Sequence, residues 1–229
     1  MAESVAALVP AAGAGARLGL GPKAFVRVGG RPLLAWAVAA LAPCVDELVV
    51  AAPAEALDGA RGIALAEAGP VPVRVIVGGA TRQATVERLA RATEAELVLV
   101  HDAARPFLDA ATVHACVASA RAHGACSVGR PVADTLVRTR GGAPVDRSQL
   151  TAGQTPQGFR RALLVRAHAA ASERGGADAT DDAGLVRLLG VDVAWVDGGA
   201  HLFKVTGPDD LALAEAWAAA RSAGAAGSA

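Results

Sequence analysis

Lysine is scarce in this chain: only two of its 22 cationic residues are lysine, and the others are arginine. Lysine offers a compact ammonium with three rotatable donors, whereas arginine offers a wide planar fork, so we expect lysine to be kept where a guanidinium does not serve. The two lysines are Lys23, at the end of a glycine-rich loop, and Lys204, in the late segment LFKVTGPDDL. Taken alone, this pattern is equally compatible with two lysines that persisted by chance.

Long apolar runs are also missing, although 53% of the residues are hydrophobic. No run reaches the ~18 consecutive apolar residues of a membrane span, and no basic segment precedes Val5–Val9, so we expect a strand there and no signal peptide. The three cysteines, Cys44, Cys116 and Cys126, form no CxxC pair. We therefore expect reduced core cysteines in a cytoplasmic protein, without a zinc site.

Acidic residues are absent between Glu3 and Asp46, in a chain whose net charge is zero. The same segment carries four cations and the loop PAAGAGARLGLGPK, whose glycines let backbone N–H groups approach a ligand closely. Exposed backbone donors and unopposed cations together favour a site for a polyphosphate. The cations are Arg17, Lys23, Arg27 and Arg31.

Two common nucleotide-binding patterns do not fit this loop. The dinucleotide fingerprint needs G-x-G-x-x-G running into a helix and an acid about 20 residues further on. Here the spacing from Gly13 to Gly19 is one residue too long, Gly21-Pro22 follows, and the acid is missing. The Walker pattern needs Gly-Lys-Ser/Thr, but Lys23 lies between Pro22 and Ala24.

Apolar runs alternate with helical patterns along most of the chain, which predicts one α/β domain with a mostly parallel sheet and ligands at the carboxyl ends of its strands. We expect strands at residues 6–9, 47–51, 74–77, 97–100, 127–132 and 192–196. We expect helices from Pro32 to about 41, and at 54–68, 81–92, 110–123, 160–173, 181–189 and from Pro208 onward.

The periodicity breaks over 132–158, a segment rich in glycine and proline. It is too long for a plain loop, so we expect a protruding β-arm, and a second subunit is the expected cover for its apolar side. The tail over 222–229 has nothing to pack against and is expected to be disordered. The whole of 1–229 then forms a single domain.

Several motifs resemble one family of nucleotidyltransferases, the 2-C-methyl-D-erythritol 4-phosphate cytidylyltransferases of the non-mevalonate isoprenoid pathway. They occur in that family's order and cover roughly residues 5 to 215. They are PAAGAGARLG…PK, GGATRQATV (78–86), HDAARP (101–106), PVADT (131–135), TPQ (155–157) and KVTGPDDL (204–211).

The resemblance implies a three-layer, Rossmann-like nucleotidyltransferase fold and transfer of CMP from CTP to a polyol phosphate, with release of pyrophosphate. It also implies a homodimer in which the arm is exchanged, and neither nucleic acid nor a membrane as a partner. Two anions must be brought together, so such an enzyme needs cations, a divalent metal and alignment more than covalent chemistry. Arg17 and Lys23 are our candidates for the cations that stabilise the transition state, although solvated loop charges are the simpler alternative.

Asp102 follows the apolar strand 97–100 and suits Mg²⁺, which takes oxygen ligands from one or two carboxylates and from phosphates. Ala103 is small enough for close approach, and Arg105 is placed to orient the carboxylate. An aspartate that caps the turn before Pro106 is the alternative. We expect His101 to be a packed residue rather than a ligand.

Cytosine recognition is expected at Gly79 and Thr85, with backbone contacts from Ala11, Ala12 and Gly13. A carbonyl and a hydroxyl suffice to read the base. The chain departs from the family here, with Ala80 where an acid is common and Thr85 where serine is usual.

The acceptor phosphate needs its own cations, and the resemblance implies Arg147 on the arm and Lys204. Hydroxyl groups implied nearby are those of Thr135, Thr155 and Thr180. Leu202 stands where the family usually has asparagine. We interpret Asp181-Asp182 as negative charge at a helix N-terminus, with support of the site as the alternative.

Two other functions remain open from the residues: a nicotinamide oxidoreductase, which the missing ribose carboxylate disfavours, and a non-catalytic nucleotide-binding module, which leaves Asp102 unexplained. Within the enzyme class, the alternative is a cytidylyltransferase for ribitol 5-phosphate or another polyol phosphate.

Overall fold

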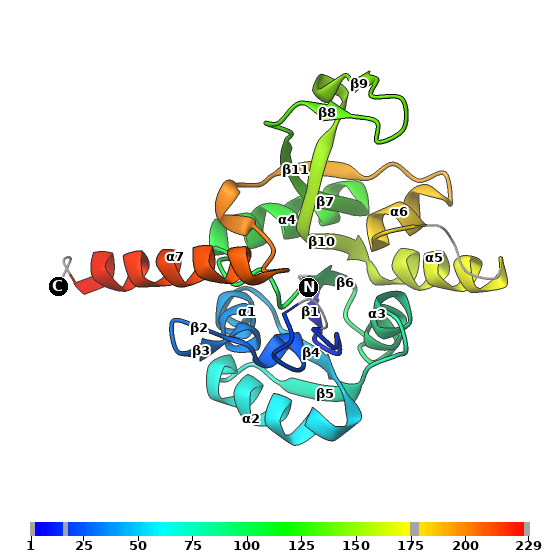
Figure 1. The fold of residues 1–229 in the computed structure, drawn as a ribbon. Coiled ribbons are helices and arrows are strands. Elements are labelled where there is room, and N and C mark those ends of the chain that lie inside the picture. The colour runs from blue at the N-terminus through cyan, green and yellow to red at the C-terminus, as the bar shows by residue number, and fades with distance from the viewer. Residues whose placement is uncertain (1–2, 16–17, 175–178, 227–229) are drawn as a thin grey trace.

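Seven strands form one sheet at the centre of a computed structural model, which describes residues 3–15, 18–174 and 179–226 (Figure 1). Their order is β11-β7-β10-β6-β1-β4-β5, and neighbouring strands are parallel except that β10 is antiparallel to both β6 and β7. The strands are β1 (Val5–Pro10), β4 (Glu47–Ala52), β5 (Val73–Val77), β6 (Leu97–Val100), β7 (Ala125–Pro131), β10 (Thr151–Arg160) and β11 (Ala194–Asp197). The predicted mostly parallel sheet is confirmed.

Helices cover both faces of this sheet, because its central strands are apolar on both sides. Alternate residues of β1 enter different cores: Ala7 and Val9 pack on one face, and Ala6 and Leu8 on the other. The first face is covered by α1 (Leu33–Leu41), α2 (Leu57–Ala68) and α4 (Ala110–His123). The second is covered by α3 (Arg82–Arg91), α5 (Arg161–Glu173) and α6 (Asp182–Arg187). The three-layer expectation is therefore also confirmed.

A third, smaller core anchors the last helix, α7 (Pro208–Ala226), against the small sheet of β2 (Arg27–Val28) and β3 (Arg31–Pro32). Aromatic rings meet here at centroid distances of 5.5 to 6.4 Å, and they come from Trp36, Phe107, Phe203 and Trp217. Phe203 directly precedes Lys204, so this packing fixes the segment that carries the second lysine.

An arm protrudes from the domain, with β8 (Leu136–Val137) and β9 (Pro144–Val145) paired at its outer end (Figure 1). Its C-terminal boundary differs from the predicted 132–158, because Gln154 through Phe159 are buried in the central sheet as part of β10. Proline normally argues against a central strand. Here Pro156 lies where the ladder between β10 and β7 is irregular, between Gly153 and Gln157.

The C-terminal tail also differs from its prediction, since residues 222–226 continue α7 and only 227–229 lie outside the described residues. A run rich in alanine favours helix even where it packs little. Across the described ranges, no helix is both long and apolar enough to cross a lipid bilayer.

Candidate active site

Four loops meet at one edge of the sheet, where the parallel strands β1, β5, β6 and β11 end. The chain leaves β1 toward β4 and β5 and later places β6 on the other side of β1, so the strand order reverses at β1. Open α/β sheets bind ligands at such a switch point, outside the carboxyl ends of the strands.

The loop after β1 folds back on itself around Gly15. Gly15 has a φ of +69°, and a Cβ there would collide with the carbonyl oxygen of Gly21, so only glycine fits. The amide of Lys23 donates to the carbonyl of Gly13 at 3.1 Å, which places Lys23 at the start of the short helix η1 (Lys23–Phe25). A Cβ on Gly13 would meet nothing within 4 Å, so this backbone borders open space. Arg17, the other predicted cation of the loop, lies outside the described residues.

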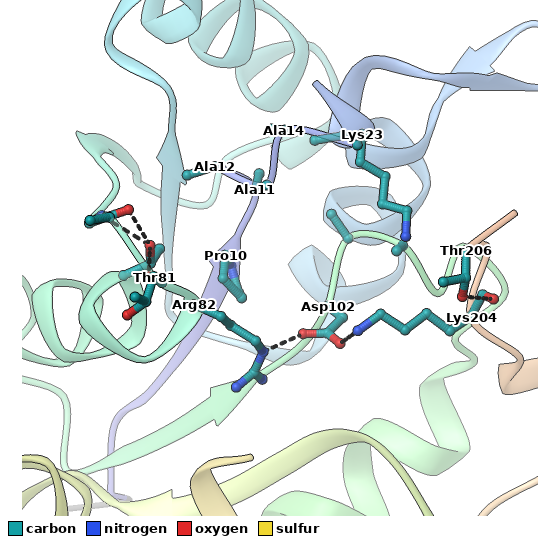
Figure 2. A pocket seen from close by; sticks show the side chains of 18 residues that line it. Pro10, Ala11, Ala12, Ala14, Lys23, Thr81, Arg82, Asp102, Lys204 and Thr206 are labelled. Carbon is teal, nitrogen blue, oxygen red and sulfur yellow. Dashed lines mark hydrogen bonds and ion pairs between the residues drawn. The ribbon is translucent and has the colours of Figure 1, made fainter. Parts of the chain in front are cut away.

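A first cavity of about 500 Å³ opens beside this loop (Figure 2). Both lysines line it, although they are 181 positions apart in sequence, 204 minus 23. The described residues of its wall include three cations, Lys23, Arg82 and Lys204, and one carboxylate, Asp102. The wall also includes the predicted base-binding and small residues, namely Ala11, Ala12, Gly13, Gly79, Thr85, Asp102 and Ala103.

The carboxylate of Asp102 lies at the centre of the site and is held from both sides (Figure 2). Its Oδ2 accepts from Nζ of Lys204 at 2.6 Å, and its Oδ1 accepts from Nε of Arg82 at 3.1 Å. Burial alone would raise the pKa of Asp102, but Arg82, Lys204 and Arg105 outweigh it and hold that pKa well below its usual range. Asp102 is therefore ionised at neutral pH.

Arg82 is a site residue that the sequence analysis missed, although the GGATRQATV motif contains it. Burial opposes its charge, yet Asp102 and Asp182 raise its pKa above the ordinary arginine value. Its position carries a signal in hindsight: it is the first residue of α3, directly after the N-cap Thr81. A cation is disfavoured at that end of a helix, so an arginine there indicates a nearby anion.

A second cavity of about 580 Å³ lies on the other side of Arg82, Asp102 and Lys204, which line both cavities. Three residues predicted for the site line only this one: Arg105, Thr155 and Thr180. Thr155 supports the backbone of Asp102: the amide of Asp102 donates to the hydroxyl of Thr155 at 3.2 Å.

Arg105 was expected to orient the Asp102 carboxylate, and the structure assigns that contact to Arg82 instead. The guanidinium of Arg105 donates to the carbonyl oxygen of Leu202 at 2.6 Å and, more weakly, to the carbonyl oxygen of Gly153 at 3.4 Å. Burial lowers its pKa. Because Leu202 is two residues before Lys204, Arg105 positions the lysine segment.

His101 is a packed residue, as predicted. It is fully buried, with Nδ1 3.0 Å from the hydroxyl of Thr155 and Nε2 3.1 Å from the carbonyl of Arg105. Burial lowers its pKa to about 4, so the ring is neutral at neutral pH.

The loop after β5 forms the far wall of the first cavity, and Thr85 holds it together. The hydroxyl of Thr85 accepts from the amide of Gly79 at 3.0 Å and donates to the carbonyl of Thr81 at 2.8 Å. A Cβ on Gly78 would collide with that of Ala12, so the loops after β1 and β5 are in close contact. Thr85 therefore fixes the shape of the loop after β5, which forms part of the wall of the first cavity.

The two predicted arm residues, Thr135 and Arg147, are exposed. Arg147 donates to the carbonyl of Ala133 within the arm, at the short helix η4 (Arg147–Gln149). As far as the chain is described, neither residue lines the two cavities of its own protomer.

Comparisons with known proteins agree with one another. The profile of the family described as "IspD: 2-C-methyl-D-erythritol 4-phosphate cytidylyltransferase" matches residues 5–219. A protein of that name from Deinococcus radiodurans is 59% identical over 214 residues, covering 92% of this chain and 88% of the relative. Another from Thermus thermophilus is 47% identical over 222 residues, covering 96% and 99%.

The fold is also shared with solved structures. The crystal structure of the 2-C-methyl-D-erythritol 4-phosphate cytidylyltransferase from Thermus thermophilus superposes with a TM-score of 0.80 at 45% identity, covering 95% of this chain and 99% of the other. A structure titled 4-diphosphocytidyl-2C-methyl-D-erythritol synthase gives a TM-score of 0.78 at 32% identity, covering 94% and 99%.

Thr85→Val keeps the shape of the side chain but removes the hydroxyl that organises the loop after β5. We expect the free energy of unfolding to fall by about 1–3 kcal/mol, because the Gly79 N–H loses its side-chain partner, while the Thr81 carbonyl keeps the backbone amide of Thr85. Urea unfolding measures this loss, and amide hydrogen exchange of residues 78–81 should accelerate. Thr85→Ser is the matched control and should behave like the wild type; a valine variant as stable as the serine variant contradicts this account.

Proposed function

The chain belongs to the 2-C-methyl-D-erythritol 4-phosphate cytidylyltransferase family, and we propose that its two joined cavities hold the two substrates of that reaction. The enzyme transfers a cytidylyl group from CTP to 2-C-methyl-D-erythritol 4-phosphate, giving 4-diphosphocytidyl-2-C-methyl-D-erythritol and pyrophosphate. The observation that carries the site assignment is that Arg82, Asp102 and Lys204 line both cavities. Two phosphorylated molecules entering from opposite sides would meet at this trio.

CTP is assigned to the first cavity. Its wall combines the glycine-rich loop, Lys23 and the backbone of residues 11–13 and 79, and a cytosine edge can be read by backbone donors and acceptors. The triphosphate then extends toward Lys23 and Asp102. Arg17 remains our second candidate for a phosphate contact from the same loop.

The acceptor phosphate is assigned to the second cavity. Lys204 and Arg105 supply positive charge, and Thr155 and Thr180 supply hydroxyl groups at its wall. Once Lys204 exchanges Asp102 for the acceptor phosphate, it holds the nucleophilic oxygen beside the α-phosphorus. That oxygen attacks in line, the bond to the β-phosphate oxygen breaks, and pyrophosphate leaves.

Asp102 is a suitable ligand for a divalent cation, which we expect to be Mg²⁺. The carboxylate is ionised, borders the cavity and offers a hard oxygen ligand. Within the described residues, no group of three or more potential ligands is present, so phosphate oxygens of CTP would complete the coordination, as is usual for Mg²⁺. A metal held there would supply Lewis-acid stabilisation of the phosphate oxygens that carry the developing charge.

Lys23 is proposed to stabilise the charge that grows on the non-bridging oxygens during transfer. Its compact ammonium suits a single oxygen better than a planar guanidinium does. Preorganised cations contribute strongly because they need no reorganisation as the charge develops.

The reaction is tested by pyrophosphate release from CTP and Mg²⁺, with 2-C-methyl-D-erythritol 4-phosphate and ribitol 5-phosphate offered separately. We expect release with the first acceptor and little with the second, and none with EDTA, because EDTA removes the divalent cation that the phosphate oxygens of CTP and Asp102 would hold. Equal release with ribitol 5-phosphate would favour the alternative acceptor. Thermal stabilisation by NAD but not by CTP with Mg²⁺ would instead indicate an oxidoreductase.

Lys23→Ala should lower kcat on the order of 10²–10³-fold, as for other preorganised charge stabilisers. Steady-state kinetics with saturating CTP measures this loss. Arg27→Ala is the control: this cation of the same segment is exposed on β2 and lines neither cavity, so its removal should leave kcat unchanged. Near-normal turnover of Lys23→Ala would refute the role of Lys23.

We further propose a cytoplasmic homodimer in which the arm of each subunit reaches the site of the other. The support is that Thr135 and Arg147 lie on an exposed arm, while the second cavity of the same protomer is lined without them. Leu136 and Val137 are exposed on the arm, at 37% and 60%, which a second subunit would cover.

Co-expression of Arg147→Ala and Lys204→Ala chains should restore activity that neither variant has alone. Random pairing makes half of the dimers mixed, and each mixed dimer has one intact site, so about a quarter of all sites should work. Activity of the tagged, co-purified mixture measures this. Lys23→Ala with Lys204→Ala is the control, since both changes affect the same protomer's site; recovery there, or none in the first pair, contradicts exchange of the arm.

A further inference from the structure

The carboxylate of Asp182 is almost completely buried, at 1% exposure, beside the active site but outside both cavities. Its Oδ2 accepts from Nη1 of Arg82 at 2.8 Å, and its Oδ1 lies 3.1 Å from Nε2 of His168. Burying an ionised carboxylate costs several kcal/mol unless it is paired and hydrogen-bonded. We therefore looked for a role of Asp182 that offsets the cost of its burial.

Asp182 does not cap the helix α6. Asp181 is the N-cap, and its Oδ1 accepts from the amide of Gly184 at 2.7 Å. The side-chain amide of Gln157 on β10 donates to the other oxygen of Asp181 and accepts from the amide of Ala183. The predicted role of helix N-terminal charge therefore holds for Asp181, whereas the side chain of Asp182 points to Arg82 and His168.

His168, on α5, completes a line of contacts behind the site. It is fully buried, and its Nδ1 has no hydrogen-bond partner among the described residues. Because the Asp182 carboxylate can only accept, Nε2 of His168 is the donor in this contact. The line runs from His168 to Asp182, then to Arg82 and finally to Asp102.

Arg82 is thus bound by two carboxylates through different nitrogens, Nε to Asp102 and Nη1 to Asp182. An arginine side chain that is held at one end loses less freedom when it binds at the other, because its planar fork is fixed in advance. On the opposite side of Asp102, Lys204 reaches the carboxylate from a loop with a similar side-chain exposure, 37% against 32% for Arg82, and among the described residues it forms an ion pair with this one carboxylate. Arg82 is the better anchored of the two cations.

We propose that Asp182 and His168 are positioning residues, which hold Arg82 so that Asp102 keeps the orientation needed for the nucleotide-bound metal when Lys204 leaves for the acceptor phosphate. The inference rests on the proposed function of the site. It predicts that breaking the line at His168 disturbs the metal and the transfer step, while the walls that bind CTP stay intact.

His168→Leu removes the donor to Asp182 and keeps a buried side chain of similar size. We expect kcat to fall, and the Mg²⁺ concentration for half-maximal activity to rise, each on the order of tenfold, as for other residues that orient metal ligands. KM for CTP should change by less than about threefold, since its binding wall is unaltered. Steady-state kinetics with 2-C-methyl-D-erythritol 4-phosphate gives these three values.

His168→Gln is the matched control, because its amide nitrogen can donate to Asp182 in place of the imidazole. It should remain within about threefold of the wild type in all three values. Asp182→Asn is a second variant: it keeps the size of the side chain but weakens its hold on Arg82, and it should resemble His168→Leu.

Binding of Mn²⁺ to the enzyme–CTP complex, measured by electron paramagnetic resonance without acceptor, supplies a readout that does not depend on turnover. Mn²⁺ affinity should fall for His168→Leu and Asp182→Asn and be retained for His168→Gln. Melting temperatures separate this effect from a general loss of stability.

The inference is overturned if folded His168→Leu matches the wild type in kcat and Mn²⁺ affinity. It is also overturned if His168→Gln and His168→Leu are impaired equally and in proportion to their loss of melting temperature, which is the result for a purely structural residue. In both cases the wild type is active; a wild type that neither binds Mn²⁺ with CTP nor releases pyrophosphate refutes the proposed function itself, and this inference with it.

Discussion

The carboxylate of Asp102 connects parts of the chain that are far apart in sequence, and the rest of the site is arranged around it. Arg82 reaches it from the start of α3, and Lys204 from the segment before α7. The two cations approach the carboxylate oxygens at 3.1 and 2.6 Å and offset the cost of burying that charge. Because the two cavities have this trio in common, whatever binds in one of them changes the charge that faces the other.

The sheet makes this arrangement possible by ending four strands at the same edge. The central strand β1 carries the glycine-rich loop, and β6 is followed within two residues by Asp102. The antiparallel β10 lies beside β6 and places Thr155 under the backbone of Asp102. Packing around Phe107 and Phe203 then brings the late segment with Lys204 back to the same place.

Sequence reasoning predicted the part of the site that local chemistry makes visible. Glycines, cations and apolar strands marked the loop after β1 and the end of β6, and the scarcity of lysine singled out Lys23 and Lys204, which do line one cavity. Arg82 was missed, and for Asp182 support of the site was only the alternative to helix N-terminal charge, because their contact spans 100 positions and exists only after α3 and α6 pack together. β10 was missed because Pro156 and Gly153 argue against a central strand unless the irregular ladder beside β7 is known.

The two lysines have a consequence for the chemistry of the whole molecule. Apart from the chain's own α-amino group, every primary amine in this protein belongs to Lys23 or Lys204, and both border the same cavity. Reagents that acylate, reductively alkylate or crosslink amines label scattered surface positions on most proteins, but here their lysine targets are confined to this cavity. Attachment of a dye or a solid support through lysine would obstruct this cavity, and any ligand bound there would shield the same two groups.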